Sequence, residues 1–348
     1  MRFFEDGPTI PDELLTARDE GRVVFFCGAG VSIARAGLPD FLGLAESVVA
    51  KLRVSADSSA YKLLNEAREI GLCAGADGLI PADRIFGLLE REFFPRYIES
   101  AVAEVLKPSP NVDPSAHKIL LDLATTPKGE IRLVTTNFDR LFDDPCLFKD
   151  RRDELQTWVA PHLPYLSHHD EMNGIVYLHG RANKEYTTSG DGRFILSSAQ
   201  FGRAYLAEGW ATRFFKEVMA CHVVVFVGYG ADDPPVHYLL EGIDQEKRSN
   251  GMYAFQSGVP DEAAAKWRHK GVEAIAYPKG CHRTLWKTLE AWAQKARSPD
   301  AWYESIIDLA KKGPTNLQPH ERGQIAYIPE FWITKRPKER RENNLVAV

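Results

Sequence analysis

Short continuous runs of apolar residues alternate along the chain with longer segments in which apolar residues recur every three or four positions. The first pattern is typical of strands buried on both faces, and the second of helices with one apolar face. Strands are predicted at 22–27, 130–139, 155–160, 174–180, 193–198, 222–230, 252–256 and 272–278. Helices are predicted at 11–21, 41–52, 61–70, 82–94, 96–106, 115–126, 199–221, 234–247, 261–271, 282–296 and 298–313.

Apolar strands that alternate with helices form parallel sheets with helices on both faces. We therefore expect an α/β fold, a Rossmann-like doubly wound parallel sheet. Between about residues 55 and 128 only helical patterns occur, which predicts a helical insertion domain. We assign residues 1–295 to one domain that contains both the sheet and this insertion.

The pattern changes at about residue 297. Residues 314–348 are rich in proline and charge and show no clear periodicity. We interpret 296–348 as a C-terminal helix and an extended tail. The tail is an arm that docks a partner or another copy of the chain, or the stump of a longer chain. The basic run "KRPKERR" within it is typical of a solvated tail.

Composition and charge argue against several further classes of protein. The 348 residues carry a net charge of −5, which argues against a nucleic-acid footprint, since that needs a basic face. No apolar run approaches the ~20 residues that span a bilayer, and the N-terminal stretch is acidic where a signal peptide is apolar. We expect a cytoplasmic protein that does not bind a membrane.

The cysteines are widely separated, and no CxxC pair occurs. A disulfide framework or a four-cysteine zinc site needs closer spacing, so neither is expected. The five positions are Cys27, Cys73, Cys146, Cys221 and Cys281.

The first strand ends in the turn "GAGVS". Gly28 and Gly30 lack side chains, so the backbone N–H groups here can approach a pyrophosphate. The turn differs from the dehydrogenase pattern GxGxxG, and it has no Walker lysine. The alternative is a tight strand–helix turn that binds nothing.

The strand at 130–139 ends in "TTNFD". Asn137 can orient a ribose or a water molecule through its amide, and nothing else in the local pattern requires an asparagine. Asp139 either contacts the ligand or caps the following helix.

His179 ends the strand pattern "GIVYLHG". A histidine here titrates near neutral pH and can serve as a general base. A structural histidine is the alternative. Its place at the same sheet edge as the two preceding motifs favours a functional role.

The strand at 222–230 runs into "GYGADDPP". Gly228 and Gly230 allow the chain to turn beside a ligand, while Asp232 and Asp233 contact a ribose or cap the next helix. His282 covers an adenine ring or starts a helix. Ligands bind at the carboxyl ends of parallel strands, so these motifs together fit a dinucleotide laid across the sheet edge.

The set "GAGVS…GLPDF", "TTNFD", "YLHG" and "GYGADDP" resembles the sirtuin superfamily over about residues 20–295. The resemblance implies that the glycine turn holds NAD phosphates and that the Pro-Asp-Phe segment shapes a nicotinamide pocket. It implies that Asn137 and His179 are catalytic. The motifs and the resemblance together predict these NAD-binding positions: Gly28, Ala29, Gly30, Ser32, Pro39, Asp40, Phe41, Thr136, Asp139, Gly228, Tyr229, Asp232, Asp233 and His282.

The chain also departs from sirtuin deacetylases. It lacks the two CxxC pairs of their zinc module, and Leu42 stands where an arginine usually follows Pro-Asp-Phe. Thr136 and Phe138 replace glutamine and isoleucine, and Tyr229 stands within a changed Gly-Thr-Ser segment. These features resemble the zinc-free bacterial sirtuin-like NADases of anti-phage defence systems.

That resemblance implies an NAD⁺ hydrolase that releases nicotinamide and ADP-ribose without a metal and depletes NAD in abortive infection. It implies a homo-oligomer triggered by a partner protein or an appended sensor, with nucleic acid contacted only through the partner. One alternative is an NAD-dependent protein deacylase or ADP-ribosyltransferase. The other is a non-catalytic regulatory module that binds NAD or ADP-ribose.

Overall fold

The computed structural model describes residues 1–74, 80–148, 155–166, 172–231, 233, 238–240 and 250–335. A seven-stranded sheet lies at its centre, in the order β3-β4-β2-β1-β5-β6-β7, and all neighbouring strands are parallel. The predicted Rossmann-like parallel α/β fold is therefore confirmed. The strands are β1 (Val23–Cys27), β2 (Arg132–Thr135), β3 (Gln156–Val159), β4 (Gly174–Tyr177), β5 (Val223–Val227), β6 (Met252–Ser257) and β7 (Glu273–Tyr277).

The central strand β1 shows why its sequence is continuously apolar. Val23, Phe25 and Cys27 point into one hydrophobic core, and Val24 and Phe26 point into the core on the other face. All five residues are buried. Successive side chains of a strand alternate between the faces, so a strand covered on both sides needs apolar residues throughout.

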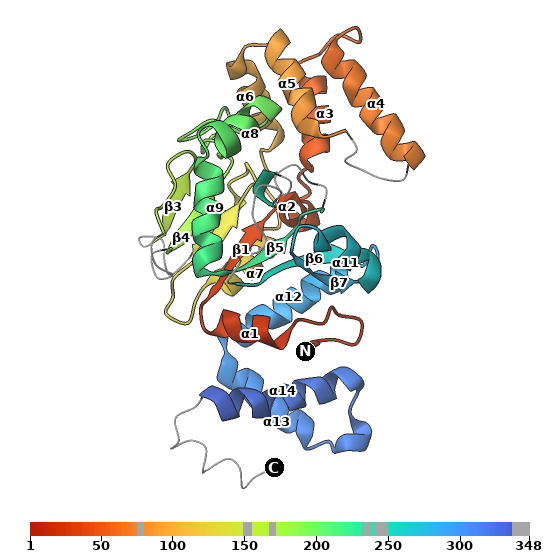
Figure 1. The fold of residues 1–348 in the computed structure, drawn as a ribbon, viewed down its shortest axis with the longest axis vertical. Helices are drawn as coiled ribbons and strands as arrows, with labels where there is room; N and C mark the ends of the chain where they lie inside the picture. Colours follow the sequence, from red (N-terminus) through yellow and green to blue (C-terminus); the bar gives the residue numbers. More distant parts are fainter. Residues whose placement is uncertain are drawn as a thin grey trace.

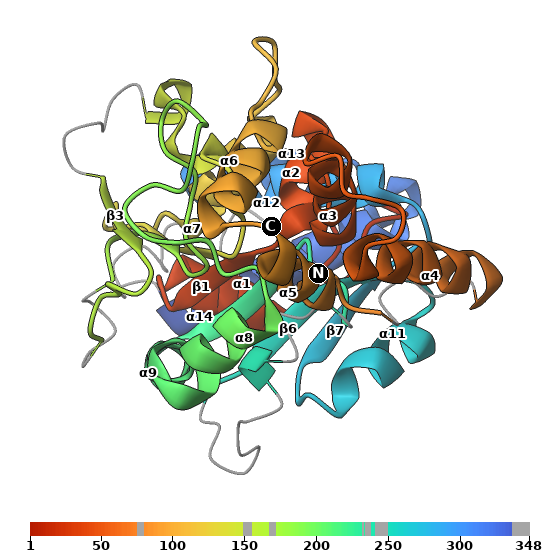
Figure 2. The same ribbon diagram turned by 90° about the horizontal axis from the view of Figure 1, so that it is seen from above.

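Helices cover both faces of the sheet (Figures 1 and 2). On one face the core includes residues of α1 (Asp12–Asp19), α7 (Ser115–Ala124) and α12 (His282–Arg297). On the other it includes residues of α8 (Ser198–Gly202), α9 (Trp210–Cys221) and α11 (Pro260–Arg268). Among the described helices none is long and apolar enough to cross a membrane.

A separate helical layer lies above the carboxyl ends of the strands (Figure 1). Its helices pack around a third hydrophobic core of their own. The next helix, α7, packs instead against β1 and β2, so it belongs to the sheet's own covering layer. The layer consists of α3 (Phe41–Lys51), α4 (Ser59–Ala74), α5 (Ala82–Glu92) and α6 (Pro95–Val105).

Two C-terminal helices, α13 (Pro299–Ala310) and α14 (Pro319–Lys335), lie at the opposite end of the molecule (Figure 1). The helix predicted at 298–313 is confirmed by α13. The expectation that 314–348 has no regular structure is wrong for α14. The physical reason is tertiary packing, because Gln324 Nε2 donates to the carbonyl oxygens of Arg2 and Phe3 and holds α14 against the N-terminal arm.

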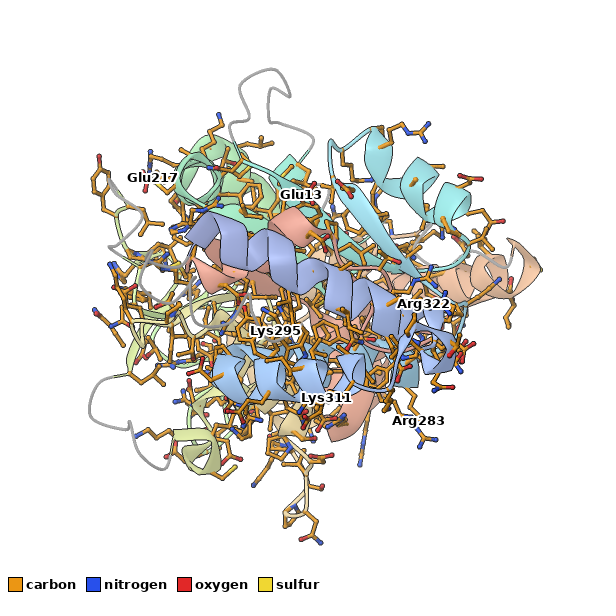
Figure 3. All side chains as sticks on the ribbon, turned by 90° about the horizontal axis from the view of Figure 1, so that it is seen from below. Glu13, Glu217, Arg283, Lys295, Lys311 and Arg322 are labelled. Atoms are coloured by element: carbon orange, nitrogen blue, oxygen red, sulfur yellow. The ribbon has the colours of Figure 1, made fainter. Side chains whose placement is uncertain are left out.

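Lys295 joins this helix pair to the body of the protein. Its ammonium group lies 2.5 Å from Asp19 Oδ2 and over the rings of Trp302 and Tyr327. Viewed from below, Lys295 lies between α13 and α14 (Figure 3). Burial lowers the pKa of Lys295, and the charge of Asp19 opposes this shift. The contact therefore joins four helices, α1, α12, α13 and α14, around one largely buried charge pair.

Two predicted elements differ in the structure. Residues 193–198 form no strand of the described sheet. The Ile195 N–H donates to His179 O, which lies beyond the end of β4, and the side chains of 194–196 pack in two different cores. The helix predicted at 199–221 is interrupted by Gly209, whose φ is +65°. Most of the helix predicted at 234–247 lies outside the described residues. The remaining short elements are α2 (Ala29–Ala36), η1 (Leu141–Asp143), η2 (Pro145–Phe148), η3 (Arg203–Ala207) and η5 (Pro314–Asn316).

Candidate functional site

A cavity of about 560 Å³ lies between the carboxyl ends of the strands and the helical layer. Each of the four sequence motifs contributes to its wall. Of the predicted positions, Gly28 is not in the lining and Asp232 lies outside the described residues. The predicted positions that line it are Ala29, Gly30, Ser32, Pro39, Asp40, Phe41, Thr136, Asn137, Asp139, His179, Gly228, Tyr229, Asp233 and His282.

The two glycine turns pack directly against each other. The Gly30 N–H donates to Gly228 O at 2.9 Å, and the Gly28 N–H donates to Val227 O at 2.9 Å. A Cβ on Gly28 would lie 2.6 Å from Gly228 O, and one on Gly30 would lie 2.8 Å from Gly228 Cα. These glycines are therefore required for backbone contact between the turns, whether or not a ligand binds there.

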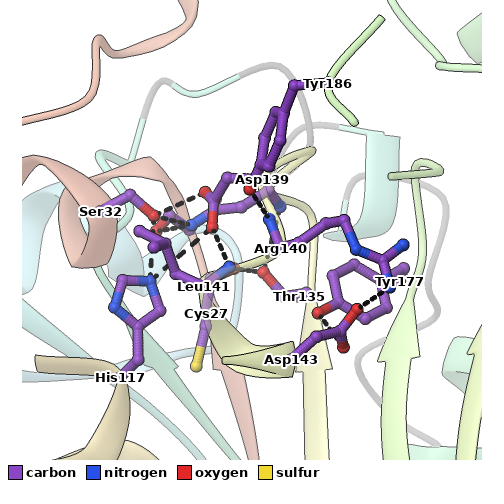
Figure 4. Close-up of polar contacts among 12 residues, drawn as sticks. Cys27, Ser32, His117, Thr135, Asp139, Arg140, Leu141, Asp143, Tyr177 and Tyr186 are labelled. Atoms are coloured by element: carbon purple, nitrogen blue, oxygen red, sulfur yellow. Dashed lines mark hydrogen bonds and ion pairs between the residues drawn. The ribbon is translucent and has the colours of Figure 1, made fainter. Parts of the chain in front are cut away.

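Behind the first turn, Ser32 and Asp139 form a buried polar network (Figure 4). Ser32 Oγ donates to Asp139 Oδ2 at 2.7 Å, and Leu141 N–H donates to Asp139 Oδ1 at 3.0 Å. Asp139 thus accepts from the first residue of η1 and also lines the cavity, and its contact with a ligand stays a prediction. His117 Nε2 lies 3.2 Å from Ser32 Oγ.

The side chain of Asn137 is held by two donated hydrogen bonds. Its Nδ2 lies 3.0 Å from Gly28 O and 3.0 Å from Ser32 Oγ. Its backbone N–H donates to Thr135 Oγ1, which in turn donates to Cys27 O. Both amide hydrogens are therefore used by the protein, and the carbonyl oxygen Oδ1 remains as the group available to a ligand.

His179 lies almost fully buried against aromatic rings. Its Nε2 is 2.6 Å from the Tyr205 hydroxyl, and its ring contacts Phe201 edge-on at 5.1 Å. Burial lowers its pKa to about 3. The imidazole is therefore neutral at physiological pH, and a positive charge on it is strongly disfavoured.

The helical layer supplies an aromatic side of the cavity. Phe41 stacks on Phe86 of α5 at 5.4 Å and lies near Phe138 and Phe201. Asp40 caps α3 by accepting the Gly43 N–H at 2.7 Å. The Pro-Asp-Phe segment is thus fixed both by a helix cap and by ring packing.

The remaining motif residues line the other side. Thr136 Oγ1 and the Tyr229 hydroxyl lie 2.9 Å apart, which joins the loops after β2 and β5. Asp233 Oδ2 accepts the Gly230 N–H at 2.6 Å. His282 begins α12 and its Nδ1 lies 3.0 Å from the Tyr277 hydroxyl, so it both starts a helix and lines the cavity.

The described lining residues carry carboxylates at Asp40, Asp139 and Asp233 but no lysine or arginine. A cationic or neutral group is therefore favoured inside, and an anionic group must rely on backbone N–H donors. The described residues also hold no group of three or more His, Cys, Asp and Glu side chains placed to share a metal ion.

A second buried network lies beside the loops after β2 and β4. Asp143 accepts from the Tyr177 hydroxyl at 2.7 Å and pairs with Arg140 at 2.7 Å (Figure 4). Asp143 also pairs with Arg181 at 2.9 Å. Arg140 follows Asp139 and Arg181 follows His179-Gly180. This carboxylate therefore joins the loops that carry the two predicted catalytic residues.

Sequence reasoning missed several residues that surround the site. Tyr205 and His117 contact motif residues but lie within helical patterns that their apolar neighbours explain, so no local signal marks them. Phe201 and Trp286 line the cavity, whereas the sequence predicts them only as helix residues. Such residues are brought to the site by the tertiary fold alone.

Comparison with known proteins gives a family match for part of the chain. Residues 131–275, from β2 to β7, match the family model of the SIR2-like domain. The chain is also similar to the uncharacterized protein y4cA of Sinorhizobium fredii, with 31% identity over 330 residues. That alignment covers 91% of this chain and 26% of the relative, so the chain spans about a quarter of the relative's length.

Two solved structures show weak similarity. A Sir2 homologue in complex with NAD aligns with a TM-score of 0.43 and 14% identity, covering 85% of this chain and 97% of that one. A mutant Sir2 homologue in complex with ADP-ribose aligns with a TM-score of 0.40 and 15% identity, covering 83% and 98%. The family assignment therefore rests on residues 131–275, which match the model of the SIR2-like domain.

Proposed function

We propose that this cavity binds NAD⁺ and hydrolyses its nicotinamide–ribose bond, giving nicotinamide and ADP-ribose. The charge of the cavity carries the proposal. Asp139 supplies a buried negative charge, His179 is neutral, and no lysine or arginine occurs among the described lining residues. Cleavage of a glycosidic bond passes through an oxocarbenium-like transition state, and such a cavity stabilises that positive charge.

Each part of NAD⁺ would contact a different wall of the cavity. The pyrophosphate would rest at the start of α2 near Ala29 and Ser32, which line the cavity, since the N–H groups of the glycine turn are already bonded to the loop after β5. Nicotinamide would lie near Asp40 and Phe41, and the adenosine would extend toward His282. The volume of about 560 Å³ lies within the range of ligand sites in proteins.

In the proposed reaction the C–N bond between ribose and nicotinamide breaks, and its electron pair passes to the ring nitrogen. A water oxygen forms the new bond to the ribose carbon and releases a proton. Asn137 would accept a hydrogen bond from that water or from a ribose hydroxyl through Oδ1. His179, with a pKa of about 3, would orient a hydroxyl as a neutral acceptor, and proton removal by it requires the pKa to rise on binding.

The biological setting proposed here rests on the resemblance to sirtuin-like NADases. We propose that the activity depletes NAD in the cytoplasm of phage-infected bacteria. We further propose that residues 1–295 form the catalytic domain and that 296–348 dock a second copy or a partner. A partner protein or appended sensor would trigger the activity.

The test is incubation with NAD⁺ followed by chromatography of nicotinamide and ADP-ribose, with and without an acyl-lysine peptide. Asn137→Ala and His179→Ala should each lower nicotinamide release by about 100-fold or more. The exposed residues Asn316 and His162 provide matched controls, as Asn316→Ala and His162→Ala should leave it unchanged.

Three outcomes contradict the proposal. Full turnover by both site variants would remove Asn137 and His179 from the mechanism. Turnover only in the presence of peptide would identify a deacylase. Binding of NAD⁺ without any product would identify a regulatory binding module. Each outcome is distinguished by the products on the same chromatogram together with a binding measurement.

A further inference from the structure

His117 is a fully buried residue that belongs to none of the four motifs and does not line the cavity. It lies on α7 and contacts Ser32, which does line the cavity. Its Nε2 is 3.2 Å from Ser32 Oγ and 3.9 Å from Asp139 Oδ1. Its ring packs edge-on against Phe142 at 4.7 Å.

The hydrogen bonds of Ser32 have a defined direction. Asp139, as a carboxylate, can only accept hydrogen bonds, so the single hydroxyl proton of Ser32 is donated to Asp139 Oδ2. The two remaining lone pairs of Ser32 Oγ can then only accept. Asn137 Nδ2 donates to one of them at 3.0 Å.

The other lone pair faces His117 Nε2, so this nitrogen must carry a proton. Burial lowers the pKa of His117, and the charge of Asp139 opposes this only in part. A neutral imidazole carries one proton. With that proton on Nε2, Nδ1 is a bare acceptor, and Nδ1 has no hydrogen-bond partner among the described residues.

We propose that His117, as the Nε2–H tautomer, is a positioning residue that holds Ser32 Oγ in place within the Ser32–Asp139–Asn137 network. Its donated hydrogen bond occupies the second lone pair of Ser32 Oγ, while Ser32 donates to Asp139 and accepts from Asn137. Ser32 Oγ, held in this place, and Gly28 O together keep the amide hydrogens of Asn137 inward and its Oδ1 toward the ligand. The catalytic consequence of this arrangement rests on the proposed function.

The amide of Asn137 has its Oδ1 available to the cavity, because Gly28 O and Ser32 Oγ both accept from Nδ2. An acceptor can bind a ribose hydroxyl or the attacking water and direct its oxygen toward the ribose carbon. Loss of the His117 hydrogen bond would let Ser32 shift and would displace Oδ1 from this position. His117 would therefore act on the rate of bond cleavage more than on the affinity for NAD⁺.

Two substitutions separate hydrogen bonding from packing. His117→Leu keeps an apolar side chain against Phe142 but removes the donor, while His117→Gln keeps an amide donor close to the position of Nε2. We expect His117→Leu to lower kcat on the order of 10-fold with KM changed less than about 2-fold, and His117→Gln to recover most of kcat. Wild-type kcat in His117→Leu, or an equal loss in both variants, would overturn the proposal.

A measurement independent of turnover completes the test. Nitrogen-15 NMR of the labelled wild-type protein should show His117 as the neutral Nε2–H tautomer, and the side-chain amide signals of Asn137 should shift in His117→Leu but not in His117→Gln. The Nδ1–H tautomer, or unchanged Asn137 signals, would refute the positioning role. If the wild-type protein releases no nicotinamide, the proposed function fails, while these spectra still decide whether His117 orients Asn137.

Discussion

His179 should make the folded protein less stable in mild acid, because burial lowers the pKa of this histidine. In the unfolded chain a histidine has a pKa near 6.5, whereas burial lowers the pKa of His179 to about 3 in the folded protein. Between these values the unfolded state binds a proton that the folded state does not. Stability therefore falls as the pH drops from 6.5 toward 3.

The size of the effect follows from the same values. Each pH unit below 6.5 costs about 1.4 kcal/mol through this one group, so lowering the pH to 4.5 removes about 2.7 kcal/mol from the free energy of unfolding. Other groups, including His117, add their own dependence. A His179→Gln variant keeps these other groups. The difference in the pH dependence of stability between the two proteins is therefore due to His179.

The assay is urea unfolding at pH 7 and pH 4.5, followed by tryptophan fluorescence. The wild-type protein should lose about 2–3 kcal/mol more than His179→Gln between the two pH values, whatever cost the substitution itself carries at pH 7. An equal loss in both proteins would refute the argument. It would mean that the pKa of His179 is the same in the folded and unfolded protein, so that burial does not keep this histidine neutral in mild acid.

Two further perturbations test the packing of the site and of the C-terminal helices. Gly228→Ala should cost at least about 2 kcal/mol more than Gly37→Ala, because both have positive φ (+76° and +66°) but only at Gly228 would a Cβ meet backbone, 2.7 Å from Val31 N. Equal losses in urea unfolding would contradict the close contact of the turns. Asp19→Ala should destabilise by about 3 kcal/mol by leaving the Lys295 ammonium buried, and adding Lys295→Met should recover most of that loss. A double variant as unstable as the single one would show that the pair is not the cause.

The fold was predictable from the sequence where burial decides the pattern. β1 and β5 are buried on both faces along their whole length, so their runs are continuously apolar and could not be mistaken for surface segments. The motifs that follow strands meet in one cavity because the carboxyl ends of parallel strands share one edge of the sheet. The roles of the residues there remain predictions.

The rest depended on contacts between distant segments. The three apolar residues at 194–196 fit the pattern of a strand. In the structure their side chains pack in two different cores, and they belong to no strand of the described sheet. α14 is stabilised through Gln324 and Tyr327 and not by a regular apolar stripe of its own. His117 gave no local signal, since its contact with Ser32 joins positions 85 residues apart.

The strand order also bears on how the protein folds. β1 lies between β2 and β5, where Phe25 pairs with Leu133 and Val23 pairs with Val223. Contacts of such long sequence separation form slowly, because the intervening chain must be closed into a loop before any pairing stabilises it. During synthesis β1 cannot pair with β5 until some two hundred further residues have been made. Only then can the turn at Gly30 meet the turn at Gly228. The order of synthesis thus makes the cavity a late product of folding, because the chain must be complete through β5 before the two turns can meet.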